Sequence, residues 1–125
     1  MVIAAYLFTF LICIVVCFQI GLAAGAPWGH LAMGGKWPGK FPPVLRVLAV
    51  VQMFVLMGLA WVMLVHAEVL MPDWIEFSGK AIWVVVGVST LAALGNVATP
   101  SKWERILWGP VGIAMWVCSL VVAFG

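Results

Sequence analysis

The stretch that decides the fold is VIAAYLFTFLICIVVCFQIGLAA, from Val2 to Ala24, which contains no charged side chain. A helix needs about 20 predominantly apolar residues to cross the hydrocarbon core of a bilayer. Three more stretches of this kind follow, and none shows the polar–apolar alternation of a membrane barrel strand. We therefore predict an all-α bundle of four transmembrane helices in one integral membrane domain, residues 1–125, with spans at about 2–24, 44–67, 80–97 and 103–124.

The composition excludes several classes of protein. Of the 125 residues, 66% are hydrophobic and 8% are charged, whereas about a quarter of the residues in a soluble domain are charged. So few charged side chains cannot cover a water-facing surface. A formal net charge of +2 also provides no basic surface for nucleic acid. The chain is therefore not expected to be a soluble enzyme domain, a disordered tail or a nucleic-acid-binding protein.

The basic residues predict the orientation of the helices. The first and third connections carry Lys36, Lys40, Arg46, Lys102 and Arg105. The second connection carries Lys80 together with Glu68, Asp73 and Glu76. Because short cytoplasmic loops are enriched in Lys and Arg, we expect the first and third connections to be cytoplasmic and both termini to be outside. No basic residue precedes the first span, so we expect a permanent span rather than a cleaved signal peptide.

Local motifs predict where helices begin. Pro42 and Pro43 suit the entrance of the second helix. The sequence Ser101-Lys102-Trp103-Glu104 has the form of a capping box, and the similar pattern that begins at Asp73 places the start of the third helix near Trp74. Tryptophans at membrane interfaces act as anchors, and we assign that role to Trp28, Trp37, Trp74, Trp83, Trp103 and Trp108.

Uncharged polar residues gather toward the cytoplasmic half of the spans. Gln19, Gln52 and Asn96 all belong to this half, and Pro110 inside the fourth helix leaves the carbonyl of Ile106 without its usual donor. One interpretation is a polar pocket that opens to the cytoplasm beside Glu104 and Arg105. The other is that the amides form hydrogen bonds between helices and contribute only to packing.

The first connection (residues 25–43) has an unusual composition. It contains five Gly, four Pro, two Trp and two Lys. Glycine-rich turns can gather backbone N–H groups around an anion, so one interpretation is a structured loop that binds an acidic headgroup or metabolite. The other is a loop anchored among the headgroups by its Trp and Phe side chains, with lysines that only set the topology. The candidate binding residues are Trp28, His30, Lys36, Trp37, Lys40, Arg46, Glu104 and Arg105.

Two segments resemble those of a family of small bacterial integral membrane proteins with four transmembrane helices, which are usually labelled uncharacterised. The resemblance rests on residues 25–29, 34–35 and 42–46 in the first segment, and on residues 95–96, 100–101, 104–105 and 108–110 in the second. Lys102 and Trp103 occupy positions expected to vary. The resemblance implies a multi-pass protein of the bacterial cytoplasmic (inner) membrane and brings no activity with it.

Two functions therefore stay open. The first is a non-enzymatic module that binds lipid or a partner protein through its cytoplasmic loop. Its expected partners are membrane lipids, anionic headgroups among them, a second copy of the chain, or another membrane protein. The alternative is a transporter or channel for small solutes or ions, lined by the polar cluster. His30 and Glu104 lack a nucleophilic partner, so we predict no catalytic residue, and we predict no metal site and no cofactor.

Overall fold

The computed structural model describes residues 2–32, 36–37, 39–69 and 72–125, and these residues form helices and turns without a strand. The long helices are α1 (Val2–Ala24), α2 (Pro43–His66), α3 (Ile75–Ala98) and α4 (Lys102–Phe124). Two short 3₁₀ helices, η1 (Gly29–Leu31) and η3 (Pro72–Trp74), lie in the first and second connections. All four long helices are long and apolar enough to cross a membrane, with mean hydropathy between 1.9 and 2.5. The predicted four-helix membrane bundle is confirmed.

The helix ends follow the sequence motifs. Pro42 is the N-cap of α2 and Pro43 its first residue. The backbone N–H of Glu104 donates a hydrogen bond of 3.3 Å to Ser101 Oγ, which is the cap contact predicted for α4. The third helix begins at Ile75 directly after Trp74, as its acidic start motif indicated. The helix is longer than the predicted span because its first turns lie before Lys80.

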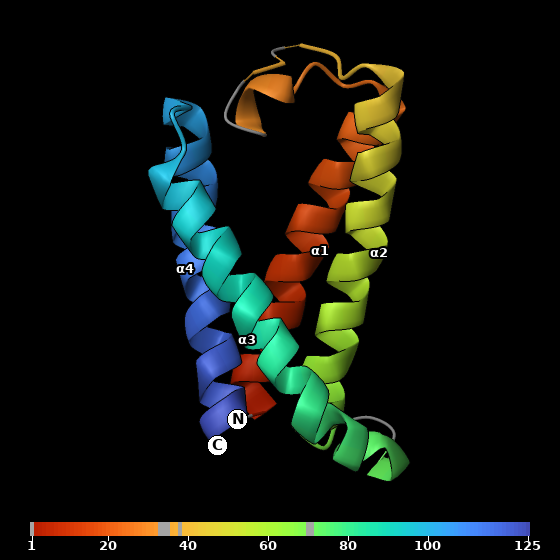
Figure 1. Ribbon diagram of the computed structural model, residues 1–125, viewed down its shortest axis with the longest axis vertical. Helices are drawn as coiled ribbons and strands as arrows, with labels where there is room; N and C mark the ends of the chain where they lie inside the picture. Colours follow the sequence, from red (N-terminus) through yellow and green to blue (C-terminus); the bar gives the residue numbers. More distant parts are fainter. Residues whose placement is uncertain (1, 33–35, 38, 70–71) are drawn as a thin grey trace.

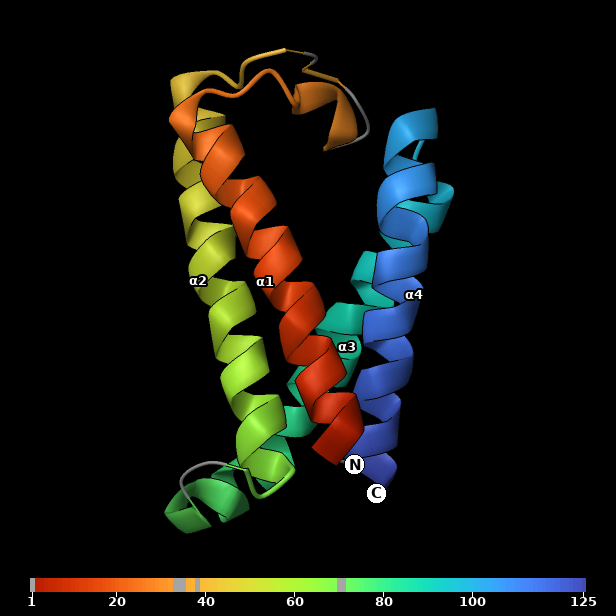
Figure 2. The ribbon, with the colours of Figure 1, turned by 180° about the vertical axis from the view of Figure 1, so that it is seen from behind.

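The helices form two antiparallel pairs, α1 with α2 and α3 with α4. Figures 1 and 2 show that the pairs converge at one end of the bundle and separate at the other. Both termini lie at the converged end, on the same side as the second connection. The first connection, including η1, crosses over the separated end.

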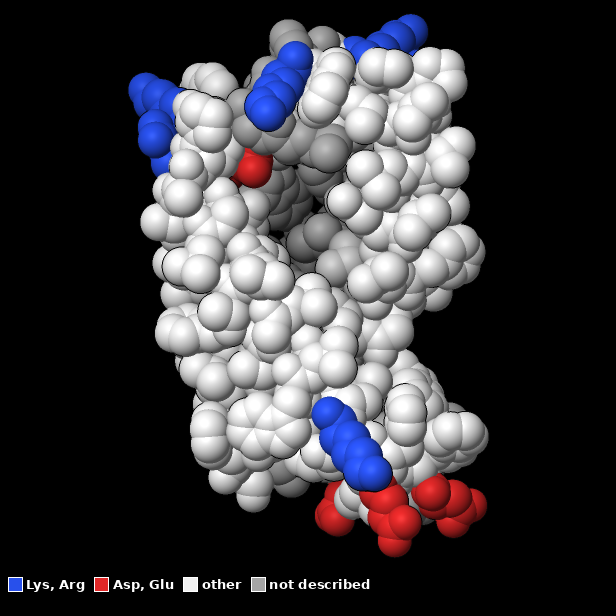
Figure 3. All heavy atoms as spheres, in the orientation of Figure 1, with Lys and Arg blue, Asp and Glu red and all other residues white. Residues whose placement is uncertain are grey.

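A hydrophobic core joins the two pairs where they converge. Its fully buried side chains include Phe8 of α1, Met63 of α2, Ile82 of α3 and Val122 of α4. Figure 3 shows acidic side chains at this end, which we call the acidic end, and most basic side chains at the other, which we call the basic end. Because this core lies at the acidic end, it does not fill the space between the two helix pairs at the basic end.

The first connection is held in place by contacts that its glycines permit. Gly25 has φ +95, and the N–H of Ala26 donates to the carbonyl of Gly21. The N–H of Gly29 donates to the carbonyl of Gly39 at 2.9 Å, and a Cβ on Gly29 would collide with backbone oxygen atoms of this connection. A small cluster of Leu22, Phe41 and Ala49 packs the connection onto α1 and α2. The described residues of the first connection are thus ordered by these contacts and lie over the basic end.

Candidate functional site

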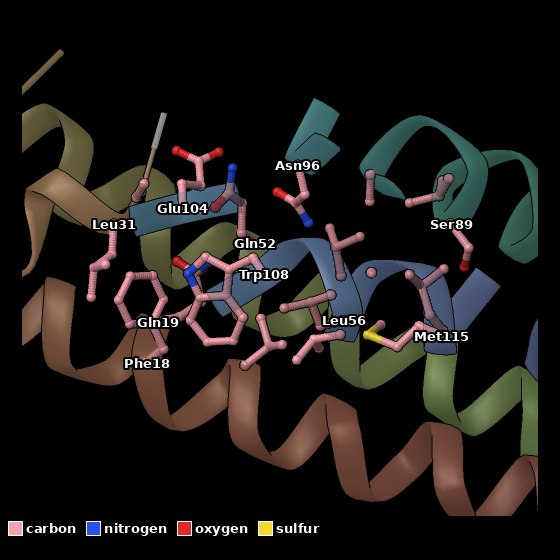
Figure 4. Close-up of a pocket in the computed structure, with 18 residues that line it drawn as sticks. Phe18, Gln19, Leu31, Gln52, Leu56, Ser89, Asn96, Glu104, Trp108 and Met115 are labelled. Atoms are coloured by element: carbon pink, nitrogen blue, oxygen red, sulfur yellow. The ribbon is translucent and has the colours of Figure 1, made fainter. Parts of the chain in front are cut away.

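A cavity of about 360 Å³ lies between the helix pairs, beneath the first connection. This volume falls in the range of small-molecule sites, about 300–1,000 Å³. Figure 4 shows the side chains on its wall. The wall is mostly apolar, and its polar members are Gln19, Gln52, Ser89, Asn96, Glu104 and Trp108.

The structure brings the three predicted amides to one cavity although they belong to three helices. Gln19 comes from α1, Gln52 from α2 and Asn96 from α3. In Figure 4, Gln19 and Gln52 lie at the end near Leu31 of η1, and Asn96 lies farther along the cavity. Gly112 on α4 leaves room for the Asn96 amide, because a Cβ there would lie 3.0 Å from Asn96 Nδ2. The amides therefore share a cavity wall instead of bonding to one another.

Glu104 completes the wall from α4. It lies in the first turn of this helix, where the partial positive charge of the helix end favours a carboxylate. Its side chain is only 7% exposed and lines the cavity. Among the described residues that line the cavity, Glu104 is the charged one, and it has an interaction partner, as buried acidic side chains usually do.

Three polar atoms on the cavity wall are buried and have no hydrogen-bond partner in the described part of the chain: Gln19 Oε1, Ser89 Oγ and Trp108 Nε1. Ser89 is 3% exposed and Trp108 is 8% exposed. Leaving such a group unpaired costs about 1–3 kcal/mol, and native structures contain few of them. Three such atoms on one wall make this cavity the candidate binding site.

Trp108 is not the interfacial anchor that its position predicted. It is buried because its ring contacts Phe18 of α1, with centroids 4.8 Å apart and planes tilted by 56°. Phe18 in turn stacks on Trp28 of the first connection, with centroids 6.0 Å apart and planes 10° apart. Trp28 also covers Gly21, where a Cβ would collide with its ring. These three rings link α1, α4 and the first connection around the basic end of the cavity.

The cavity reaches past the middle of two of the helices. At about 1.5 Å of rise per residue, Leu59 lies about 24 Å from the start of α2 and Met115 about 20 Å from the start of α4, and both side chains line the cavity.

The cavity also opens sideways, between α2 and α3. Gln52 and Val55 on α2, and Val88 and Ala92 on α3, line it and are at the same time exposed on the outside of the bundle. Figure 3 shows the corresponding hollow in the face of the molecule, below the basic side chains. In a membrane this opening would face lipid.

No family model, curated protein or solved structure matches the chain. The resemblance to the small bacterial membrane proteins stays a prediction, and so do the bacterial origin and the cytoplasmic membrane. The site must therefore be judged from its own geometry.

Five other predicted site residues, Trp28, Lys36, Trp37, Lys40 and Arg105, lie around the basic end and are not part of the described cavity wall. Lys36, Trp37, Lys40 and Arg105 are exposed. Trp28 is 40% exposed although one side of its ring is packed. The side chain of His30 lies outside the described part of the chain. Whether these residues bind a partner protein or a second copy stays a prediction.

Neither Arg46 nor Pro110 is part of the described cavity wall. The Nε–H of Arg46 donates to the carbonyl of Phe41 at 2.9 Å, so this side chain holds the first connection against α2. Pro110 lies within α4, is exposed, and is absent from the cavity wall. The carbonyl of Ile106 thus belongs to no polar cluster in the cavity.

The sequence interpretation missed Ser89, Phe18 and Trp108 as members of the site. Ser89 and Asn96 are seven residues apart on α3, which corresponds to two helical turns and hence to one face. That spacing could have linked Ser89 to the amides. Nothing in the sequence distinguishes Phe18 and Trp108 from other aromatic residues near a membrane interface, because only their contact across helices places them at the cavity.

Proposed function

We propose that this protein binds a phospholipid whose polar part enters the cavity at the basic end while its acyl chains stay in the bilayer. The proposal is carried by the buried, unpartnered polar atoms Gln19 Oε1, Ser89 Oγ and Trp108 Nε1 on the wall of one cavity. A bound molecule with hydrogen-bond donors and acceptors would remove the free-energy cost of leaving them unpaired.

Two further features support a lipid over a water-soluble ligand. The cavity wall is mostly apolar, and the opening between α2 and α3 faces the side of the bundle. A lipid could move from the bilayer through this opening without passing through water. The basic side chains at the same end would attract the phosphate, as juxtamembrane Lys and Arg residues do.

Binding is favoured over the alternative of transport. Toward the acidic end the space between the pairs is filled by the core around Phe8, Met63 and Val122. The described residues therefore close the cavity toward the acidic end, and an ion or solute entering from the basic end would meet this core. A transporter would need a second arrangement in which the core separates, and no feature of the described residues favours one.

A cavity-filling variant tests the proposal. Ala92→Phe adds a phenyl ring at the lateral opening, and Leu91→Phe is its matched control because Leu91 is 71% exposed and is not part of the cavity wall. Each protein is extracted in mild detergent, and the phospholipid that remains bound is quantified by native mass spectrometry. We expect Ala92→Phe to retain less than about a tenth of the lipid bound by the unchanged protein, the effect of losing about 1.4 kcal/mol of binding free energy.

Leu91→Phe should retain as much lipid as the unchanged protein. Thermal melts in lipid-free detergent check that both variants are folded. Equal retention by Ala92→Phe and Leu91→Phe, with both folded, would show that lipid binds elsewhere on the surface and would overturn the proposal.

A further inference from the structure

The unpartnered polar atoms on the cavity wall form a pattern of hydrogen-bond donors and acceptors. Gln19 Oε1 is an acceptor, Trp108 Nε1–H is a donor, and Ser89 Oγ is both; all three atoms are buried and lack a hydrogen-bond partner among the described residues. Resting on the proposed function, we infer that the bound lipid is a phospholipid whose headgroup carries hydroxyl groups, as in phosphatidylglycerol. The hydroxyls would enter the cavity, and the phosphate would stay at the lateral opening near the basic side chains.

Gln19 and Trp108 belong to the same end of the cavity. Gln19 follows Phe18 in the chain, and the Phe18 ring contacts the Trp108 ring with centroids 4.8 Å apart. Figure 4 shows Gln19 and Trp108 together on the cavity wall. A headgroup at this end therefore meets an acceptor and a donor.

A hydroxyl group is the simplest partner for both atoms. It donates to Gln19 Oε1 and accepts from Trp108 Nε1–H, because a hydroxyl has one O–H and two lone pairs. An ammonium group only donates and an ionised phosphate only accepts, so neither alone satisfies both atoms. The donor–acceptor pattern therefore favours a hydroxyl at this end of the cavity.

The two hydroxyls of a glycerol headgroup also reach the third atom. At about 1.5 Å of rise per residue, Trp108 lies about 9 Å from the start of α4 and Ser89 about 14 Å from the end of α3. The difference in depth, about 5 Å, is within reach of two neighbouring hydroxyls that each form a hydrogen bond of about 2.8 Å. One hydroxyl would pair with Gln19 and Trp108, and the other with Ser89.

The charge of the wall agrees with an uncharged headgroup end. Glu104 is the charged residue among the described wall residues, and it already has an interaction partner, so we assign it no contact with the ligand. The three unpartnered atoms belong to uncharged side chains. Burying an ionic group among uncharged ones costs free energy unless an opposite charge pairs with it, whereas hydroxyls bring no charge into the cavity.

The basic side chains suit the phosphate of the same lipid. Lys36, Lys40, Lys102 and Arg105 are exposed at the basic end, and Figure 3 shows basic side chains above the hollow in this face of the molecule. Phosphatidylglycerol carries one net negative charge, on its phosphate, and Lys and Arg near a membrane surface attract such a charge. An anionic phosphate outside the wall and neutral hydroxyls inside it match both regions.

A competition experiment at constant lipid charge tests the inference. The protein in detergent is mixed with equal amounts of phosphatidylglycerol, phosphatidylethanol and phosphatidylcholine that share the same acyl chains, and bound lipid is read by native mass spectrometry. Phosphatidylethanol has the same net charge as phosphatidylglycerol but no headgroup hydroxyl. Phosphatidylglycerol should bind at least about tenfold over each of the others, because these leave the Gln19 acceptor unpaired.

Gln19→Met removes the acceptor and keeps a side chain of similar length. The preference for phosphatidylglycerol over phosphatidylethanol should fall to about threefold or less, with the donor of Trp108 still in place. The melting temperature of the delipidated variant should not fall, because the substitution removes a buried acceptor that lacks a partner in the described structure.

Thr9→Val is the matched control. Thr9 lies on the same helix, α1, and is not part of the described cavity wall; its Oγ1 donates to the carbonyl of Ala5 at 2.8 Å. This substitution also replaces a polar side chain by an apolar one, and it should leave the lipid preference unchanged. An equal loss of preference in both variants would overturn the inference.

The other outcomes separate the inference from the function on which it rests. Equal binding of phosphatidylglycerol and phosphatidylethanol, with both reduced by Ala92→Phe, would overturn the hydroxyl inference and leave lipid binding in the cavity standing. Binding that Ala92→Phe does not reduce would overturn both. Displacement of phosphatidylglycerol by an equal concentration of water-soluble glycerophosphoglycerol would overturn the lipid proposal and support recognition of the hydroxyls.

Discussion

Two buried serines provide a direct test of whether the cavity wall is incomplete in the free protein. Ser89 and Ser119 are 3% and 0% exposed, and both lie in long helices, α3 and α4. Ser119 Oγ donates to the carbonyl of Trp116 at 2.6 Å, whereas Ser89 Oγ has no partner among the described residues. Ser119→Ala removes a hydroxyl that has a hydrogen-bond partner, and Ser89→Ala removes one that lacks a partner in the described structure.

The expected effects differ in sign. Ser119→Ala should lower the free energy of unfolding by about 0.5–1.5 kcal/mol, the net value of one hydrogen bond. Ser89→Ala should raise it by about 1 kcal/mol, the lower part of the range for removing an unpaired buried group, because polar contacts within membranes are weaker than expected for an apolar solvent. The change in helix propensity from Ser to Ala is the same at both sites, so it cancels in the comparison.

The assay is thermal unfolding of delipidated protein in detergent, followed by tryptophan fluorescence. A difference of about 2 kcal/mol between the variants corresponds to melting temperatures roughly 6–12 °C apart for a domain of this size. Adding back the bound lipid should reverse the advantage of Ser89→Ala, because that variant loses a hydrogen bond to the ligand. If Ser89→Ala melts as low as Ser119→Ala without lipid, the Ser89 hydroxyl has a partner in the empty cavity and the reasoning fails.

Two other predictions concern the first connection and the orientation. Gly29→Ala should destabilise the protein by about 1–3 kcal/mol, because its Cβ would collide with backbone oxygen atoms of the connection. Gly79→Ala, with open space around it, should instead stabilise the protein by about 0.5–1 kcal/mol. Shifts of the melting temperature in the same direction for both variants would contradict this prediction. In a background without the native cysteines, Glu76→Cys should react with a membrane-impermeant maleimide in intact cells and Lys36→Cys only after permeabilisation. The reverse labelling pattern would invert the orientation.

The helices themselves could be predicted because each depends on local information. A run of apolar residues long enough to span hydrocarbon, such as residues 2–24, must satisfy its own backbone hydrogen bonds, and a helix does so within the segment. The helix starts at Pro43 and Ser101 were predicted for the same reason, since caps act within a few residues of the chain. The order of the spans along the sequence was also enough to predict that Gln19, Gln52 and Asn96 lie in the same half of the bundle.

The cavity could not be predicted, because it depends on how the helix pairs meet. Apolar side chains occur all around each helix of a membrane bundle, so the sequence does not identify which of them form the core. The core around Phe8, Met63 and Val122 closes one end, and the pairs separate toward the other. Because of that separation, the amide side chains line a cavity and do not form hydrogen bonds between the helices.

By itself, the sequence determined that this is a four-helix membrane protein with basic residues at one end, because hydrophobic length and charge are properties of segments. Only the tertiary structure decided that Trp108 is a buried wall residue instead of an interfacial anchor, and that Ser89 and Glu104 share its cavity. The physical reason is that burial and unsatisfied hydrogen bonds arise between segments: they exist only when α1 and α2 are placed against α3 and α4.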